Sequence, residues 1–455
     1  MKSAEGADSG GVDEPIYKPK QMHTVTGMLK RILIIAAGVV LGLVLSLGAA
    51  RLALAWGLFP NRDLERSSAY MREVLQLVNE NYVDAKSSSY DQLAKSALHG
   101  MVESLDPHSE FLESKDYTEL EEELSGDFSG IGVQVEMRKG RVVVIAPIAG
   151  SPGEKAGILR GDELLSVDGK SLERGLSMDA VIDRLRGKAH TKVAVSLLRP
   201  STGRTFDLTL VREVIKLESV RDVHVVGEHT GYIQLTEFSD HTGEEFGKAL
   251  DQLLKQGIDS LVLDLRNNPG GLLDAAVDVA EPFFRKGELI VYTQGRKPAD
   301  REDYRASAEG DPLRLPMAIL INTGSASAAE VVTGALKDTG RAVVVGERSF
   351  GKGSVQSIFK LKNGEGLRLT TAKYYTPSGV SIHEKGIAPQ VEVVMTPEED
   401  SRLRLQRLRP DVVDPKDFKE RFGFAPVADR QLDAALDVLK GINLLRERAA
   451  PPVAH

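Results

Sequence analysis

The chain has 455 residues, a formal net charge of −8 and a pI of about 5.7, so it lacks the basic character of a nucleic-acid-binding protein. It contains no cysteine, which excludes thiol catalysis, disulfides and zinc–thiolate sites. No histidine pair stands at a metal-binding spacing, and we expect neither a metal nor a cofactor. The length allows two or three domains with a sizeable core.

The N-terminus carries an apolar segment behind a basic pair. Residues 1–31 are polar, and we expect them to be disordered and cytoplasmic; they end in Lys30-Arg31, which favours this orientation. Residues 32–55 are the predicted anchor or signal peptide, and the uncharged apolar run within them, Ile32 to Ala50, is about long enough to cross a bilayer, which needs roughly 20 residues. Ala53-Leu-Ala55 offers a cleavage site, so a removed signal peptide competes with a retained anchor. The length of the run favours the anchor, and in both cases the remainder lies outside the cytoplasm.

Residues 61–126 are predicted to form an N-terminal helical region. Helical periodicity covers residues 66–83 and residues 90–105, and the second stretch ends at Asp106-Pro107, a helix stop. His108 and Glu110 follow, but their spacing suits no common set of metal ligands. We therefore assign this segment a structural role.

Short alternating strands and Gly-rich turns fill residues 127–213. The loop Gly130-Ile131-Gly132-Val133 is followed by a Gly/Pro segment ending in Ala156-Gly-Ile158, and then by Gly161-Asp-Glu-Leu-Leu-Ser-Val-Asp-Gly169. This succession resembles a PDZ domain. A Gly-rich turn that leads into a strand points successive amides into one concavity, where the C-terminal carboxylate of a peptide can bind. The alternative is that the glycines serve only a tight turn.

Residues 214–396 alternate between strands and helices, which predicts a sheet with helices packed on it. Residues 397–455 are charged and helical, and we interpret them as an assembly segment. The predicted fold class is therefore multidomain α/β. It combines N-terminal helices, an inserted PDZ domain resembling a β-barrel, an α/β sheet core and a helical C-terminal segment.

Ser327 stands where a predicted strand, residues 317–321, turns into a predicted helix. The turn reads Asn322-Thr-Gly-Ser-Ala-Ser-Ala-Ala-Glu330. Such a turn exposes a side chain at the end of a sheet, beside the positive end of a helix. Taken alone, the Ser-x-x-Glu pattern also fits a capping box, in which the serine only caps the helix.

A serine nucleophile needs a base, and the candidate is Lys352 between Gly351 and Gly353. A lysine can accept a proton only if desolvation makes its neutral form accessible, so a solvated loop lysine is the alternative. Gly346-Glu-Arg-Ser-Phe-Gly-Lys352 also matches a phosphate-binding loop. We reject that reading because Gly353 replaces the Ser or Thr that holds magnesium, and because an extended segment follows where a helix is needed.

Three further motifs, together with the PDZ-like region, resemble the carboxyl-terminal processing peptidases, which are Ser-Lys serine peptidases also called tail-specific proteases. The resemblance runs from the N-terminal helices to about residue 395. Ala329 and Gln390 depart from the family pattern without touching a catalytic group. The motifs are Asp264-Leu-Arg-Asn-Asn-Pro-Gly-Gly271, Gly324-Ser-Ala-Ser-Ala-Ala-Glu330 and Ser349-Phe-Gly-Lys-Gly-Ser-Val-Gln356.

The resemblance implies a role for each matching residue. Ser327 is the expected nucleophile, Lys352 the general base and Gln356 the residue that orients the lysine amine. The amides of Gly271 and Ala328 are expected to form the oxyanion hole. Peptide C-termini are expected at the loop formed by Gly130, Ile131, Gly132 and Val133.

The implied function is that of a serine endopeptidase of the bacterial cell envelope, on the periplasmic side of the inner membrane, anchored or released. Its partners would be protein or peptide substrates, a lipoprotein adaptor and further copies of the chain. The alternative function is that of a membrane-tethered PDZ binding module whose peptidase fold is inactive without a partner.

Overall fold

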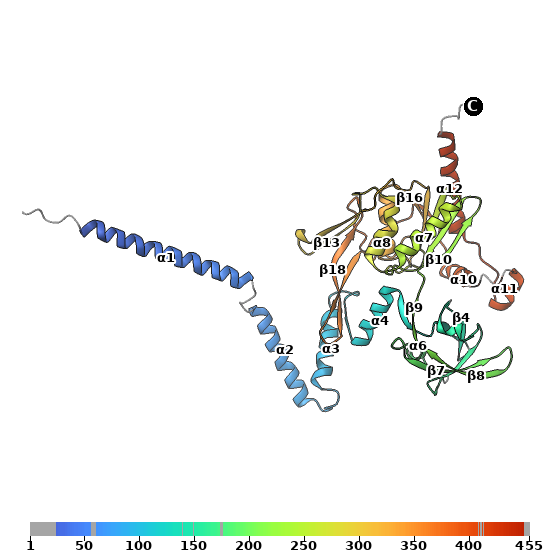
Figure 1. Ribbon diagram of the computed structural model, residues 1–455, viewed down its shortest axis with the longest axis horizontal. Helices are drawn as coiled ribbons and strands as arrows, with labels where there is room; N and C mark the ends of the chain where they lie inside the picture. Colours follow the sequence, from blue (N-terminus) through green and yellow to red (C-terminus); the bar gives the residue numbers. More distant parts are fainter. Residues whose placement is uncertain are drawn as a thin grey trace, which may run out of the picture. The chain divides into compact units, whose positions relative to one another are not determined.

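The computed structural model describes residues 24–55, 61–138, 140–148, 150–172, 176–407, 409, 412 and 414–449 (Figure 1). Most of the segment predicted to be disordered, residues 1–31, therefore lies outside the described residues. The chain divides into two compact units, residues 1–97 and residues 98–455, which are described separately.

The N-terminal unit is helical, in agreement with the periodicity of the sequence. It contains α1 (Thr24–Ala55), α2 (Arg62–Asn81) and the first half of α3 (Tyr90–Glu103). Within α1, Lys30–Ala49 has a mean hydropathy of 2.7, and α1 is the one described helix long and apolar enough to cross a membrane. α2 begins after Asn61, whose side chain accepts hydrogen bonds from two amides of the first turn.

The second unit is built on a six-stranded sheet, as the alternation of strands and helices predicts. All neighbouring strands pair in parallel except β10, which is the antiparallel edge. In spatial order the strands are β10 (Val220–Val226), β11 (Thr230–Leu235), β12 (Ser260–Asp264), β15 (Met317–Ile321), β16 (Ala342–Gly346) and β19 (Val391–Glu392).

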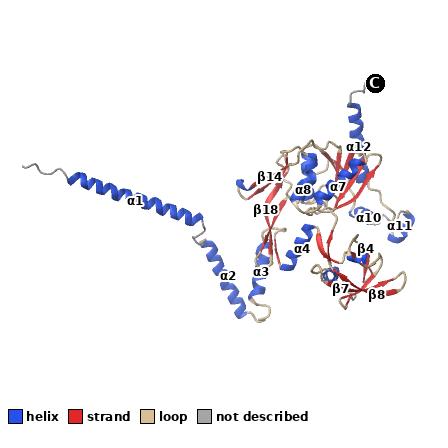
Figure 2. Ribbon diagram, viewed as in Figure 1, coloured by secondary structure: helices blue, strands red, loops and turns tan. Residues whose placement is uncertain are grey.

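Helices cover both faces of this sheet, so its central strands are buried throughout. Leu263 and Ile319 pack with the helices of one face, whereas Val262 and Leu320 pack with α12 on the other. The first face is covered by α7 (Thr242–Lys255), α8 (Leu273–Ala280) and α9 (Ala328–Asp338), and the second by α12 (Arg430–Ala449) (Figure 2).

A second sheet, which the sequence analysis did not predict, lies beside the first. Its strands are antiparallel, and β17 pairs with β18 off the main path. The strands are β1 (Glu110–Leu112), β18 (Gly366–Tyr375), β13 (Leu289–Gly295), β14 (Arg301–Arg305) and β17 (Ser354–Lys360). The short helix η1 (Glu281–Phe283) precedes β13, η2 (Pro298–Asp300) precedes β14, and α4 (Ser114–Ser125) follows β1.

The PDZ-like region is inserted between two paired strands, β2 (Asp127–Gly130) and β9 (Glu213–Lys216). Its own sheet has β3 at one edge, so one side of that strand is open to pairing. The elements are β3 (Val133–Arg138), β4 (Arg141–Pro147), α5 (Pro152–Lys155), β5 (Glu163–Val167), β6 (Lys170–Ser171), α6 (Met178–Leu185), β7 (Lys192–Arg199) and β8 (Arg204–Val211).

The C-terminal segment is joined to the sheet by a buried ion cluster. The guanidinium of Arg266 binds Asp264 at 2.6 Å and Asp429 at 2.7 Å, and Arg407 binds Asp264 at 2.9 Å. Asp264 is fully buried, yet the pKa of its carboxyl is lowered because the charges and hydrogen bonds of the arginines outweigh the cost of burial. α10 (Pro397–Arg407), α11 (Pro415–Phe422) and α12 are therefore part of the folded core region. Their predicted role in assembly stays a prediction.

Candidate active site

Ser327 lies at the corner between β15 and α9 that the sequence predicts. It is the residue before the first helical position, with φ of 52°, a left-handed conformation that costs a non-glycine residue energy. The turn is held in place by its neighbours. The amide of Ala326 donates to the carbonyl of Asn268 at 2.9 Å, and the hydroxyl of Ser325 donates to the carbonyl of Leu265 at 2.7 Å. Ser327 is 7% exposed and lines a cavity of about 270 Å³.

Glu330 takes its expected place in the capping box, but it does more than cap the helix. Its buried carboxylate accepts the amide of Ser327 at 2.9 Å and the amide of Lys352 at 2.8 Å. It also accepts the amide of Gly351 at 2.8 Å and the hydroxyl of Ser349 at 2.5 Å. Burial raises the pKa of Glu330, and the four donated hydrogen bonds oppose that rise. One carboxylate thus joins the segments that carry the two candidate catalytic residues.

Lys352 lines the same cavity as Ser327, just before β17. Burial lowers the pKa of its amine, and the positive charge of Arg368 lowers it further. Among the described residues, Nζ of Lys352 has no hydrogen bond or ion pair. The lysine is half-buried, so the alternative of a solvated loop lysine does not describe it. The carboxylates of Glu123 and Glu330 oppose this shift without reversing it, and an amine with a lowered pKa gives up its proton more readily and can then act as a base.

The glycine loop after β12 runs directly against the nucleophile. A Cβ on Gly270 would lie 2.6 Å from Cβ of Ser327, and one on Gly271 would lie 2.0 Å from the carbonyl oxygen of Phe238. The amide of Gly270 is used by the side chain of Asn268 at 2.9 Å. Within the described part of the chain, the amides of Gly271 and Ala328 donate to no acceptor. Both predicted oxyanion-hole donors are therefore free to bind a substrate oxygen.

Gln356 also lines the cavity, but the structure records no hydrogen bond from it to Lys352. Its Nε2 donates to Oγ1 of Thr370 at 2.9 Å and to Oγ of Ser354 at 3.2 Å. Its Oε1 is buried and has no partner among the described residues. The side chain is close to the site, and its acceptor is unused.

The rest of the cavity wall combines apolar side chains with the charged Glu123, Glu237 and Arg368. Tyr374 is buried against Ser327, and burial raises the pKa of its phenol to about 12, while a hydrogen bond with the Ser327 hydroxyl acts in the opposite direction. Other apolar side chains come from α4, α8, β17 and the loops before α7 and α8: Leu120, Leu124, Phe238, Pro269, Leu272, Leu273, Val355 and Ile358.

The predicted peptide loop of the PDZ-like region lies outside this cavity. The amides of Ile131 and Gly132 donate to no acceptor in the described residues, whereas their carbonyls accept the amides of Gly153 and Ile148, each at 2.8 Å. Gly130 ends β2 and Val133 begins β3, the open edge strand. The loop therefore has the free amides that a carboxylate requires.

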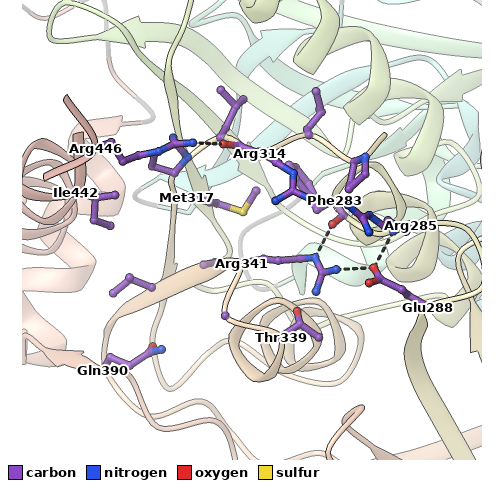
Figure 3. A pocket seen from close by; sticks show the side chains of 17 residues that line it. Phe283, Arg285, Glu288, Arg314, Met317, Thr339, Arg341, Gln390, Ile442 and Arg446 are labelled. Carbon is purple, nitrogen blue, oxygen red and sulfur yellow. Dashed lines mark hydrogen bonds and ion pairs between the residues drawn. The ribbon is translucent and has the colours of Figure 1, made fainter. Parts of the chain in front are cut away.

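A larger cavity of about 740 Å³ lies at the other end of the central strands, where they begin, away from Ser327 (Figure 3). It borders Met317 and Ala342, where β15 and β16 begin, whereas Ser327 follows the end of β15. Two of its arginines are engaged with main-chain carbonyls: Arg341 with Phe283 at 2.5 Å and Arg446 with Arg314 at 3.2 Å. It contains none of the candidate catalytic residues.

The sequence analysis missed Glu330 as a link between the two catalytic segments, and it missed the network around Asp106. Asp106 accepts the hydroxyl of Thr370 at 3.1 Å, and Thr370 in turn contacts Gln356. The available signal was the run of polar residues after Asp106, which we interpreted as structural. No group of three or more possible metal ligands occurs in the described residues.

Comparison with known proteins agrees with these observations. Residues 229–393 match Peptidase family S41, and residues 143–199 match the PDZ domain. The chain is 35% identical to a carboxy-terminal-processing protease of Bartonella bacilliformis, over 91% of this chain and 96% of that protein. It is 37% identical to the carboxyl-terminal-processing protease of Synechocystis, over 80% of this chain and 81% of that protein.

Carboxy-terminal processing protease CtpA of Bacillus subtilis is 38% identical over 69% of this chain and 68% of its own length. These relatives align with most of the chain, including the segments that carry the cavity and the PDZ-like region. The chain therefore belongs to peptidase family S41, as a serine peptidase of the carboxy-terminal processing type with a PDZ domain.

Proposed function

We propose that the chain cleaves peptide bonds by a Ser-Lys acyl-enzyme mechanism. The observation that supports this most directly is the state of Lys352. Lys352 lines the Ser327 cavity, its amine has a lowered pKa because it is buried near Arg368, and it makes no ion pair among the described residues. A lysine in that state is suited to accept the proton of a serine hydroxyl.

The steps follow from the groups in the cavity. Oγ of Ser327 attacks the peptide carbonyl while Nζ of Lys352 takes its proton, and the carbonyl becomes an oxyanion. The free amides of Gly271 and Ala328 stabilise that oxyanion, a contribution of about 10²–10³ in rate for each donor. Lys352 returns the proton to the leaving amine, and a water then hydrolyses the acyl-enzyme with Lys352 again as the base.

We further propose that the PDZ domain binds the C-termini of its substrates. The unpaired amides of Ile131 and Gly132 would hold the terminal carboxylate, and the peptide would pair with the open edge of β3. The names of the relatives, which are carboxy-terminal processing proteases, favour this specificity.

The proposed location is the cell envelope, on the periplasmic side of the inner membrane. The support is α1, whose Lys30–Ala49 stretch is long and apolar enough to anchor the chain or to serve as a signal segment. A lipoprotein adaptor and further copies of the chain are proposed as partners on the family resemblance alone.

The test is cleavage of an unfolded casein by the full chain in detergent, beside Ser327→Ala and Lys352→Ala. We expect the wild type to cleave and both variants to be inactive. Cleavage by Lys352→Ala would refute the assignment of the base. If the wild type is inactive both alone and with envelope extract, the second candidate holds: a tethered PDZ module whose peptidase fold needs a partner.

A further inference from the structure

The amide of Gln356 is turned so that its acceptor is left without a partner. Nε2 donates to Thr370 and Ser354, whereas the buried Oε1 accepts nothing among the described residues. A buried acceptor without a hydrogen bond costs about 1–3 kcal/mol. Because the amide can rotate to exchange its two ends, this orientation must be imposed by the neighbouring groups.

The residue that imposes this orientation is Asp106, which acts on Gln356 through Thr370. Oδ1 of Asp106 accepts the Thr370 hydroxyl at 3.1 Å, and Oδ2 accepts the Ser109 hydroxyl at 2.7 Å. Burial opposes ionisation of Asp106, yet the donated hydrogen bonds hold the pKa of its carboxyl below the usual value. An ionised carboxylate can only accept hydrogen bonds, so Asp106 fixes the direction of every bond it makes.

The single hydroxyl proton of Thr370 then determines the orientation of the Gln356 amide. The Thr370 hydroxyl has one proton, and Asp106 takes it. The Thr370 oxygen can therefore only accept a hydrogen bond from Gln356, and Gln356 must donate that bond from its NH₂ group. The reverse orientation would place two acceptors against each other. Oε1 is thus held away from Thr370 and stays buried without a partner among the described residues, in a side chain that lines the same cavity as Lys352.

From this geometry we infer that Asp106, acting through Thr370, is a positioning residue for the Lys352 base. It keeps the carbonyl oxygen of Gln356 available to accept an N–H from the lysine amine. The amine is then held by one hydrogen while its lone pair takes the proton of Ser327. This inference rests on the proposed Ser-Lys mechanism and adds to it a residue from the N-terminal end of the unit.

The pairing of β1 with β18 brings Asp106 and Thr370 together. Glu110 lies opposite Arg368 in the register, and the amide of Thr370 donates to Oγ of Ser109 at 3.1 Å. A slip of one residue would turn Thr370 to the other face of the sheet and break the contact with Gln356. The polar segment after Asp106, assigned only a structural role from the sequence, therefore supports the base.

The test compares Thr370→Val with Thr370→Ser in the full chain, measuring the pH dependence of casein-peptide cleavage. Valine keeps the shape but removes the hydroxyl, so the amide can turn its NH₂ group toward Lys352. We expect kcat to fall about 10-fold, a part of the 10²–10⁴ that general-base catalysis contributes. The acidic limb of kcat/KM should move to lower pH, because a facing donor disfavours the ammonium form. Thr370→Ser should restore both quantities.

Asp106→Ala provides an independent variant, because without the carboxylate the Thr370 hydroxyl can turn its proton toward Gln356, whose amide can then face Lys352 with its NH₂ group. We expect the same fall and the same shift of the acidic limb. Thr371→Val is the matched control: its hydroxyl contacts Ser357 on the exposed side of β18, and it should behave as the wild type. A loss of kcat without movement of the limb, or wild-type behaviour of Thr370→Val, would overturn the inference. If the wild type itself does not cleave, the proposed function fails instead.

Discussion

The carboxylate of Glu330 accepts hydrogen bonds from the amides of both Ser327 and Lys352, at 2.9 and 2.8 Å. Glu330 belongs to α9, and Lys352 precedes a strand of the other sheet. The distance between nucleophile and base is therefore set by one buried side chain that does not itself line the cavity. The same carboxylate makes the predicted cap of α9.

Replacement of Glu330 by glutamine should lower the stability of the fold and also disturb the positions of Ser327 and Lys352. An amide has only one acceptor atom, so two or more of the four donors lose their partner, at about 1–3 kcal/mol each. We expect a lower midpoint of denaturant unfolding and a loss of kcat of about 10² or more, since small misplacements of catalytic groups are costly. Wild-type kcat in a folded Glu330→Gln variant would show that Glu330 only caps the helix.

Arg368 should set the pH at which Lys352 becomes a base. Burial is the main cause of the lowered pKa of Lys352, and the charge of Arg368 adds to it. Removing that charge in Arg368→Gln should raise the pKa, so the acidic limb of kcat/KM moves to higher pH. Arg368→Lys keeps the charge and is the control. An unmoved limb in Arg368→Gln would mean that the two cations do not interact.

Lys352 should also reduce the stability of the fold. Its folded pKa lies below the ordinary value of 10.5, so the unfolded chain binds more protons between those two values and stability rises with pH in that window. Lys352→Met should therefore be more stable than the wild type at about pH 7, with the difference shrinking toward about pH 10. Urea unfolding at both pH values measures this difference in stability. A Lys352→Met variant that is less stable than the wild type at about pH 7 would contradict the prediction.

Gly271 should tolerate no side chain. With φ of 139° and a Cβ position 2.0 Å from the carbonyl oxygen of Phe238, Gly271→Ala must displace the loop that carries one oxyanion donor. We expect a fall in kcat of about 10²–10³. Gly247→Ala is the matched control, because its Cβ meets nothing within 4 Å in the middle of α7. Comparable losses in the two variants would point to general destabilisation.

Arg407 should be essential for stability although it lies in the C-terminal segment. It binds the fully buried Asp264 at 2.9 Å, and removing one partner of a buried pair costs about 3–5 kcal/mol. Arg407→Ala should lower Tm strongly. Arg421→Ala breaks only an exposed pair with Asp417 on α11 and should cost at most about 1 kcal/mol. Equal Tm values for the two variants would refute the importance of the buried cluster.

The sequence predicted the central sheet well, because strands such as β12 and β15 are continuous apolar runs followed by turn residues. It predicted Ser327 and Lys352 because each stands in a motif dense in small residues. The second sheet was missed because β18 mixes buried and half-exposed positions without a period of two. The contact between Asp106 and Thr370 joins residues 264 positions apart, and no local pattern encodes it.

The PDZ loop is a second case in which the sequence predicts the local structure but not the long-range pairing. The sequence motif predicted a turn with free amides, and in the part of the chain that the structure describes the amides of Ile131 and Gly132 have no acceptors. That β3 would be the open edge of its sheet depends on how six strands pair, and pairing over such distances cannot be read from spacing alone.

The burial of α9 has a consequence for how activity is lost on heating. Every residue from Ala328 to Leu336 is buried, so the amides of this helix can exchange with solvent only when the domain opens as a whole. β17, which follows Lys352, is exposed over its last residues and can open locally at a lower free energy. Opening below the melting temperature should therefore begin at the far end of β17, away from Lys352, whose amide is held by Glu330, and chains that cool in time should recover activity without refolding α9 or Ser327.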